Sequence, residues 1–314
     1  MAVQVRDGAP ADAATAWSLP ASGPGAQPAF PQALCDEVET YLGGLRLGAP
    51  GASEGLVEAM RYSLLAGGKR IRPVLVLATA RAVGAPWRDL LPLAGAVELI
   101  HTFTLIHDDL PAMDDDDLRR GRPTSHRVYG EGVAVLAGDA LFAEGVRLLL
   151  ELDAPHERTL AAARVVTRAV GTDGLAAGQY IDVAGTATDE AAVLQMHRLK
   201  TAALLQACVQ AVLELTRPQP DVCEALTIYA AELGLMFQIV DDILDVSATS
   251  AESGKSPGSD HRNGRRTLVV DGAVGRARQL ADECLARIAA ALHGLPCETS
   301  ELLGIALLTR HRCG

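Results

Sequence analysis

Aspartates are concentrated in one stretch of the sequence, residues 99–121, which reads LIHTFTLIHDDLPAMDDDDLRRG. An apolar segment leads into Asp108 and Asp109, and four further aspartates precede Arg119 and Arg120. Neighbouring carboxylates repel one another unless a cation or solvent offsets their charge. A solvated acidic turn is the usual interpretation of such a run alone. The apolar approach and the two arginines instead favour a metal-bridged anion site.

A second acidic segment, FQIVDDILD, occupies Phe237–Asp245. Asp241 and Asp245 are four residues apart, so an unbroken helix places both on one face, where they can share a metal ion. Gln238 lies one turn before Asp242. Acidic pairs at this spacing are common on exposed helices, but the apolar flank GLMFQIV predicts that this face is interior.

The first acidic segment has a spacing that no helix brings to one face. Asp114 follows Asp108 by six residues, and Pro111 disfavours helical geometry at Leu110. We therefore expect the helix to end or bulge there and Asp114 to curl back. Residues 115–117 are either further ligands or solvated side chains. An EF-hand is excluded because the alternating ligands and the glycine at the sixth loop position are missing.

Carboxylate oxygens without histidine or cysteine ligands select a hard cation, and Mg²⁺ shares its coordination with substrate phosphates. Residues 67–73, GGKRIRP, supply cations for such an anion. Lys69 and Arg72 are expected on one face at a helix start, with Pro73 in the first turn. A lysine, a guanidinium and free helix N–H groups form a phosphate site. A basic helix start on the surface is the alternative.

Composition limits the remaining classes. The 314 residues carry a net charge of -11, with 49% hydrophobic and 4% aromatic residues. An acidic chain without a basic stripe is not expected to bind nucleic acid. The six cysteines show no metal-ligand spacing and are interpreted as reduced thiols of a cytoplasmic protein. Residues 1–28 are expected to be a disordered extension, with one domain over 29–314. No membrane-spanning segment is expected.

Apolar residues recur at helical spacing, whereas alternating strand patterns are missing, so the chain is predicted to be all-α. After a first helix near Phe30, the expected helices are 54–66, 73–84, 89–109, 130–152, 156–177, 188–215, 220–246 and 272–292.

Together, DDLPAMD, DLRRGRPT, GGKRIRP and FQIVDDILD resemble the trans-isoprenyl diphosphate synthases of the polyprenyl synthetase family. The resemblance runs from about Phe30 to the C-terminus. It implies a single-domain isoprenoid synthase fold, with antiparallel helices around a deep cavity, in a homodimer. Three Mg²⁺ ions are expected to bridge the two acidic segments to an allylic diphosphate, and isopentenyl diphosphate is the second substrate. The implied metal ligands are Asp108, Asp109, Asp114, Asp241 and Asp245, with Asp242 and Lys200 as further catalytic residues.

The resemblance also assigns substrate contacts. Isopentenyl diphosphate is expected to bind Lys69, Arg72, His101 and Arg120, and the allylic diphosphate to bind Arg119. His101 lies two helical turns before Asp108, on the same face. As a lone histidine on an apolar helix, it is alternatively a core residue. The remaining implied contacts are Lys200 and Thr201 of HRLKTAALL, Gln238, Lys255 and Arg265.

Residues 247–267 are interpreted as a lid over the diphosphate, with a linker as the alternative of the same composition. The family has an aromatic residue and a proline after the position of Thr267, where this chain has Leu268 and Val269. Arg310 and Arg312 are candidates for the family's basic C-terminal cap.

Product length is expected to depend on Phe103 and Thr104, which lie about 6 to 8 Å below Asp108 along the helix. An aromatic residue there resembles farnesyl diphosphate synthases, and small residues resemble geranylgeranyl producers. A C15 product is favoured over C20. Two other classes remain: a class I terpene cyclase, whose second motif would carry Asn, Ser and Glu, and a non-catalytic synthase subunit, against which the intact acidic segments argue.

Overall fold

The computed structural model describes residues 30–48, 51, 53–247, 268–269 and 274–312, and most of them are helical. The predicted all-α class is confirmed. The helices are α1 (Gln32–Gly44), α2 (Glu54–Leu64), α3 (Ile71–Ala82), η1 (Trp87–Leu90), α4 (Leu91–Asp108), α5 (Ser125–Tyr129), α6 (Glu131–Leu150), α7 (His156–Val170), α8 (Leu175–Val183), α9 (Glu190–His197), η2 (Arg198–Ala202), α10 (Ala203–Thr216), α11 (Pro220–Ser247), α13 (Val274–Leu292) and α14 (Ser300–His311).

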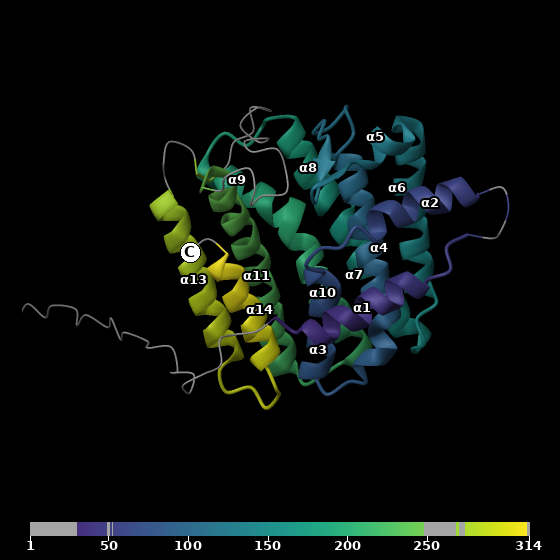
Figure 1. Ribbon diagram of the computed structural model, residues 1–314. Helices are drawn as coiled ribbons and strands as arrows, with labels where there is room; N and C mark the ends of the chain where they lie inside the picture. The colour runs from purple at the N-terminus through teal and green to yellow at the C-terminus, as the bar shows by residue number, and fades with distance from the viewer. Residues whose placement is uncertain (1–29, 49–50, 52, 248–267, 270–273, 313–314) are drawn as a thin grey trace, which may run out of the picture.

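The helices form one bundle in which α10 and α11 are central (Figure 1). Helix α4 packs against α6 and α3, while α10 packs against α7, α11 and α3. Helix α13 lies along α11, and the last helix, α14, contacts α3, α11 and α13. The last helix therefore packs between α3 and α11, which carries the second acidic segment.

Burial follows the apolar pattern of each helix. In α1, Leu34, Val38 and Leu42 are buried on one stripe. Helices α4 and α11 belong to two segments, Trp87–Asp108 and Pro220–Val246, that are long and apolar enough to cross a membrane. However, 61% and 56% of their apolar windows are buried inside the bundle, as in core helices.

Two predicted helices differ from the observed ones. The helix expected over 156–177 is divided between α7 and α8, because Gly171 and Gly174 lie at the break. The helix expected over 188–215 is helical from Glu190 to Thr216 but contains the π-helical turn η2. Helix α14 was not among the predicted helices.

Between α4 and α5, two strands form a hairpin, β1 (Leu118–Arg119) and β2 (Arg122–Pro123). Arg120 and Gly121 connect them with φ angles of 54° and 74°. Positive φ at both central residues is typical of a type I′ turn, and glycine adopts it without strain. The predicted N-terminal extension, most of the proposed lid, Lys255 and Arg265 lie outside the described residues.

Candidate active site

Helix α4 ends at Asp108, as the position of Pro111 predicts. The chain then turns back, and the Asp114 N–H donates a hydrogen bond of 2.9 Å to the Asp108 carbonyl. Asp115 completes the turn with a φ of 51°. The predicted return of Asp114 toward the helix end is therefore confirmed. Asp108 and Asp114 are both partly exposed.

Asp109 has a different environment, because it is only 4% exposed and is held by Arg119. The Arg119 Nε donates to Asp109 Oδ1 at 2.9 Å, and a terminal nitrogen of the same guanidinium donates to the same oxygen. Asp116, also buried, lies 3.7 Å from that terminal nitrogen. A charge-assisted contact of this kind is a strong one. Asp109 thus orients Arg119, and of the three metal ligands predicted in this segment, Asp108 and Asp114 are the accessible ones.

The neighbouring aspartates at 115 and 117 face outward. Arg127 lies 2.5 Å from Asp117 and 4.0 Å from Asp115, and all three side chains are half exposed or more. Surface ion pairs of this kind contribute little to stability. Of the residues whose role the sequence left open, Asp116 alone is buried.

The GGKRIRP segment does not begin as predicted. Helix α3 starts at Ile71, and Arg70 precedes it in the left-handed region with a φ of 48°. The prediction that Lys69 and Arg72 share a helix face is therefore wrong, because Lys69 lies in the loop. Pro73 is in the first turn, as expected.

Arg70 is a structural residue that the sequence analysis did not single out. Its guanidinium is buried and reaches three acceptors: Glu98 at 2.5 Å, Glu39 at 2.7 Å and the Leu64 carbonyl at 2.7 Å. These contacts fix the loop that carries Lys69.

The hairpin and the GGKRIRP loop touch through Arg120, which donates to the Gly67 carbonyl. Gly68 has a φ of 122°, which L side chains rarely adopt, and a Cβ there would lie 2.6 Å from the Arg120 guanidinium carbon and displace it.

His101 lies at the centre of a group of cations. The Arg72 guanidinium is 3.2 Å from His101 Nε2. Burial, followed by the charges of Arg72, Arg120 and Arg119, lowers the pKa of His101 well below its ordinary value of 6.5. The imidazole is therefore neutral at physiological pH, and its Nε2 accepts from Arg72. The predicted approach of Arg72, His101 and Arg120 is present.

In this group of cations, Arg119 is paired with Asp109, whereas burial is the main influence on the other members. Burial lowers the pKa values of Lys69, Arg72 and Arg120, and neighbouring positive charges lower those of Lys69 and Arg120 further. The buried Arg72 Nε makes no hydrogen bond to any described residue. Clustered cations with such pKa shifts favour binding of a multiply charged anion.

We expect His101 to make stability pH-dependent. Its pKa is lower in the folded than in the unfolded chain, so the unfolded chain binds the proton more tightly. Neutral His101 therefore contributes fully to the free energy of unfolding at pH values above its pKa in the unfolded chain. This contribution is lost as the pH falls toward the pKa of His101 in the folded chain. Urea unfolding between about pH 7 and pH 5 should show a shallower pH slope for His101→Gln than for the wild type. His293→Gln, at an exposed position, should keep the wild-type slope. An unchanged slope in His101→Gln would contradict this assignment.

The second acidic segment repeats the arrangement of the first. Asp242 is 3% exposed, whereas Asp241 and Asp245 are partly exposed. Asp241 forms an ion pair of 2.9 Å with Arg312, the residue after α14. The Arg312 guanidinium also lies over the Phe237 ring, 5.2 Å from its centroid. In each segment the second aspartate of the pair is buried, and the first and last are accessible. Arg310 pairs instead with Asp282.

The π-helical turn η2 presents Lys200 and Thr201 to two neighbouring helices. Lys200 forms an ion pair of 2.5 Å with the buried Asp182 of α8. Thr201 donates to the Gln238 side-chain oxygen at 2.6 Å. A Cβ at Gly178 would lie 2.2 Å from the Lys200 backbone nitrogen, so glycine is required where α8 meets the turn. π-turns of this kind are frequent at functional sites.

Sequence reasoning did not identify two residues of α8, Gln179 and Asp182. Asp182 neutralises Lys200, and Gln179 is 7% exposed with neither side-chain polar atom bonded to a described residue. In the sequence, the polar residues of GQYID, residues 178–182, directly before a glycine-containing loop, could have indicated a functional role for Gln179 and Asp182.

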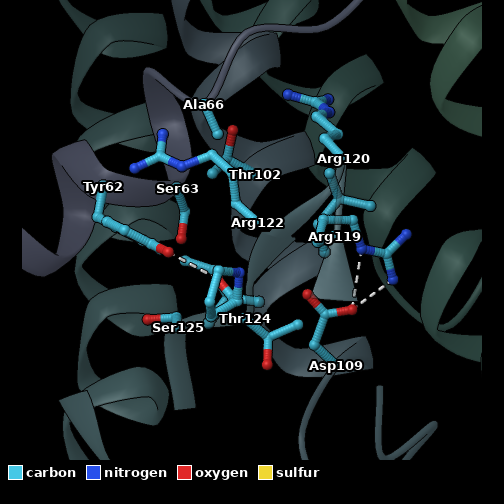
Figure 2. Close-up of a pocket in the computed structure, with 13 residues that line it drawn as sticks. Tyr62, Ser63, Ala66, Thr102, Asp109, Arg119, Arg120, Arg122, Thr124 and Ser125 are labelled. Carbon is cyan, nitrogen blue, oxygen red and sulfur yellow. Dashed lines mark hydrogen bonds and ion pairs between the residues drawn. The ribbon is translucent and has the colours of Figure 1, made fainter. Parts of the chain in front are cut away.

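A small pocket of about 30 Å³ lies behind the first acidic segment (Figure 2). Tyr62, Thr102, Arg119 and Ser125 are among its lining residues. Its size accommodates one or two water molecules. This pocket is therefore too small to hold a diphosphate substrate.

Phe103 and Thr104 are placed on different sides of α4. The Phe103 ring packs against Phe142 of α6, with centroids 5.3 Å apart, and edge-on against His107. Thr104 is buried and donates to the His101 carbonyl.

A sequence model of the polyprenyl synthetase family matches residues 53–293, and the chain belongs to this family. Dimethylallyltranstransferase of Fischerella ambigua is 41% identical over 248 residues, which cover 76% of this chain and 72% of the relative. Farnesyl diphosphate synthase of Geobacillus stearothermophilus is 46% identical over 217 residues, 68% of this chain and 73% of the relative. The chloroplastic heterodimeric geranylgeranyl pyrophosphate synthase large subunit 1 of Arabidopsis thaliana is 45% identical, and the match spans 72% of this chain but only 63% of that longer protein.

Solved structures agree with this assignment. A geranyltransferase from Helicobacter pylori, complexed with magnesium and isoprenyl diphosphate, superposes with a TM-score of 0.78 at 29% identity, covering 89% of this chain and 94% of its own. An FPP/GFPP synthase from Zymomonas mobilis gives 0.75 at 33% identity, covering 88% and 95%. The predicted isoprenoid synthase fold is thereby confirmed.

Proposed function

We propose that the chain is a short-chain trans-prenyltransferase that condenses isopentenyl diphosphate with dimethylallyl or geranyl diphosphate. The observation that carries this proposal is the grouping of accessible carboxylates with clustered, partly buried cations. Four carboxylates supply hard oxygen ligands, and the cations around His101 favour a polyanion. The accessible carboxylates are Asp108, Asp114, Asp241 and Asp245. The cations are Lys69, Arg72, Arg119, Arg120 and Lys200.

Magnesium fits these donors, and three ions are proposed between the acidic segments and the diphosphate. Bound Mg²⁺ neutralises charge on a departing pyrophosphate. Among the described residues, no three acidic, histidine or cysteine side chains are grouped closely enough to form an ion site. Bound Mg²⁺ would complete its coordination with water or diphosphate oxygens, as it commonly does. Asp109 and Asp242 are already hydrogen-bonded to other side chains, and we propose that they orient the neighbouring metal and diphosphate ligands.

In the proposed reaction, the allylic carbon–oxygen bond breaks and its electron pair leaves with pyrophosphate. The double bond of isopentenyl diphosphate attacks the resulting cation, and a proton is then lost, which the released pyrophosphate accepts. Lys69, Arg72 and Arg120 hold isopentenyl diphosphate, whereas Arg119 and Lys200 hold the allylic diphosphate. Neutral His101 accepts from Arg72 and so orients its guanidinium.

The proposed active form is a homodimer in the cytoplasm. Exposed apolar side chains on α5, α6 and α7 support an interface there: Val128, Val135, Leu136, Leu150 and Leu160 are between 38% and 58% exposed. Exposed apolar surface marks interaction sites where such side chains adjoin one another.

Farnesyl diphosphate is the proposed product, with geranylgeranyl diphosphate as the second candidate. If the Phe103 ring limits chain growth, Phe103→Ala should extend the product by at least one five-carbon unit. Chromatography of dephosphorylated products from the wild type and the variant measures this. Unchanged chain length would refute the role of Phe103 as the floor.

The proposed function is tested by incubating the purified chain with Mg²⁺, isopentenyl diphosphate and each allylic diphosphate in turn. We expect pyrophosphate release only when both substrates are present. Hydrocarbon formation from an allylic diphosphate alone would instead identify a cyclase, and no release with any donor would support the non-catalytic subunit.

A further inference from the structure

A buried histidine outside the predicted site, His197, contacts the second acidic segment. Its Nε2 lies 2.8 Å from Asp242 Oδ2, and the two side chains are 4% and 2% exposed. They are 45 residues apart in sequence. A carboxylate only accepts hydrogen bonds, so the imidazole Nε2 is the donor. Burying a polar group is costly unless it is hydrogen-bonded, so this contact stabilises the Asp242 carboxylate in its buried position.

Asp242 receives two further hydrogen bonds. Gln238 Nε2 donates to Oδ1 at 2.9 Å, and the backbone N–H of Leu268 donates to Oδ2 at 3.0 Å. Three donors from three chain segments therefore fix the rotation of this carboxylate. Asp241, the adjacent residue on the same helix, takes its direction from the same backbone.

The network continues from Asp242 to the π-helical turn. Because the Gln238 nitrogen donates to Asp242, its amide oxygen faces Thr201 and accepts the hydroxyl proton at 2.6 Å. The orientation of the Thr201 hydroxyl is thus set by Asp242 through one intervening amide.

His197 is also the last residue of α9 and directly precedes η2. Lys200, three residues later, pairs with Asp182 of α8. Residues 197–200 therefore contact α11 through His197 and α8 through Lys200. Lys200 is also a proposed diphosphate ligand.

We propose that His197 is a positioning residue, which acts through Asp242 to hold the second acidic segment and Thr201 in register with Lys200. The proposal rests on the proposed function in one respect, namely that these groups bind the allylic diphosphate. Its physical basis is hydrogen-bond donation by Nε2 into a buried carboxylate.

The test compares His197→Ala, which removes the donor, with His197→Gln, whose side-chain nitrogen can occupy the position of Nε2. Tyr229→Phe is the matched control. Tyr229 lies on the same helix as Asp242, α11, about 20 Å away along the axis, and the substitution removes its buried hydrogen bond of 2.9 Å to the Leu302 carbonyl of α14. All variants are first compared by thermal unfolding.

Two measurements then report on position. Amide hydrogen exchange at Leu268 should be about tenfold faster in His197→Ala, because the Asp242 acceptor is no longer fixed. The inorganic pyrophosphate concentration that half-saturates binding with excess Mg²⁺ should rise about tenfold in His197→Ala and remain within about threefold of wild type in His197→Gln. Tyr229→Phe should lower the melting temperature without moving either value.

Wild-type values of both quantities in His197→Ala would overturn the proposal, as would a His197→Gln variant as impaired as His197→Ala. If the wild type binds Mg²⁺ and pyrophosphate but forms no prenyl product, the proposed function fails while the role of His197 stands. If the wild type does not bind pyrophosphate, the proposed function fails, and exchange at Leu268 alone decides whether His197 fixes Asp242.

Discussion

Asp108→Asn and Asp241→Asn should each lower kcat by at least about 10³-fold while the chain stays folded. Each change removes one charged oxygen ligand from an accessible carboxylate in a different acidic segment. The proposed metal contribution is several kcal/mol of charge stabilisation on the leaving pyrophosphate, and each factor of ten in rate corresponds to about 1.36 kcal/mol. Steady-state kinetics at saturating Mg²⁺ and substrates measures the loss.

The matched control is Asp117→Asn, in the same acidic run. Asp117 is 63% exposed on its side chain and pairs with Arg127. Because exposed pairs contribute little, both kcat and the melting temperature should stay close to wild type. A loss of kcat in Asp117→Asn as large as in Asp108→Asn would mean that the total negative charge of the acidic run, and not Asp108 as a ligand, determines the rate. Activity that survives both Asp108→Asn and Asp241→Asn would contradict the assigned ligands.

The largest expected effect on stability is that of Arg70→Ala, at about 3 to 5 kcal/mol. The substitution leaves Glu98, which is 1% exposed, as a buried carboxylate without its guanidinium partner. For a chain of 314 residues the melting temperature should fall by about 5 to 8 °C. Binding of isopentenyl diphosphate should weaken as well, because the loop that carries Lys69 loses its anchor.

Arg81→Ala is the comparison for Arg70→Ala. Arg81 pairs with Glu301 at 3.0 Å, but its side chain is 44% exposed, so the expected cost is below about 1 kcal/mol. Adding Glu98→Gln to Arg70→Ala should recover part of the lost stability, since it removes the unpaired charge. Equal destabilisation by Arg70→Ala and Arg81→Ala in chemical unfolding would refute the importance of burial at Arg70.

The sequence predicted those features that depend on neighbouring residues. The apolar periodicity identified most helices, and Pro111 predicted where α4 ends and Asp114 turns back. The cation group around His101 was implied by the resemblance of its motifs to the polyprenyl synthetase family. The apolar periodicity and the proline are local signals, and the structure preserves them.

The sequence could not show which aspartate of each pair is buried. Asp109 and Asp242 are alike in sequence context to Asp108 and Asp241. Their burial depends on donors elsewhere in the fold, Arg119 for one and His197 for the other. Only tertiary packing brings these partners together.

Backbone irregularities were equally hidden. The π-helical turn Arg198–Ala202 lies in an uninterrupted helical pattern, so periodicity alone indicated one regular helix. Because Arg70 is left-handed, α3 begins at Ile71 and Lys69 lies outside the helix. Both departures occur where charged side chains must reach partners on other helices.

The most direct test of the proposed function is the stoichiometry of product and pyrophosphate in one reaction, with labelled isopentenyl diphosphate, geranyl diphosphate and Mg²⁺. The proposed mechanism predicts one pyrophosphate released for each five-carbon unit incorporated into a longer prenyl diphosphate. Pyrophosphate release without incorporation of the label, or no release at all, would contradict it.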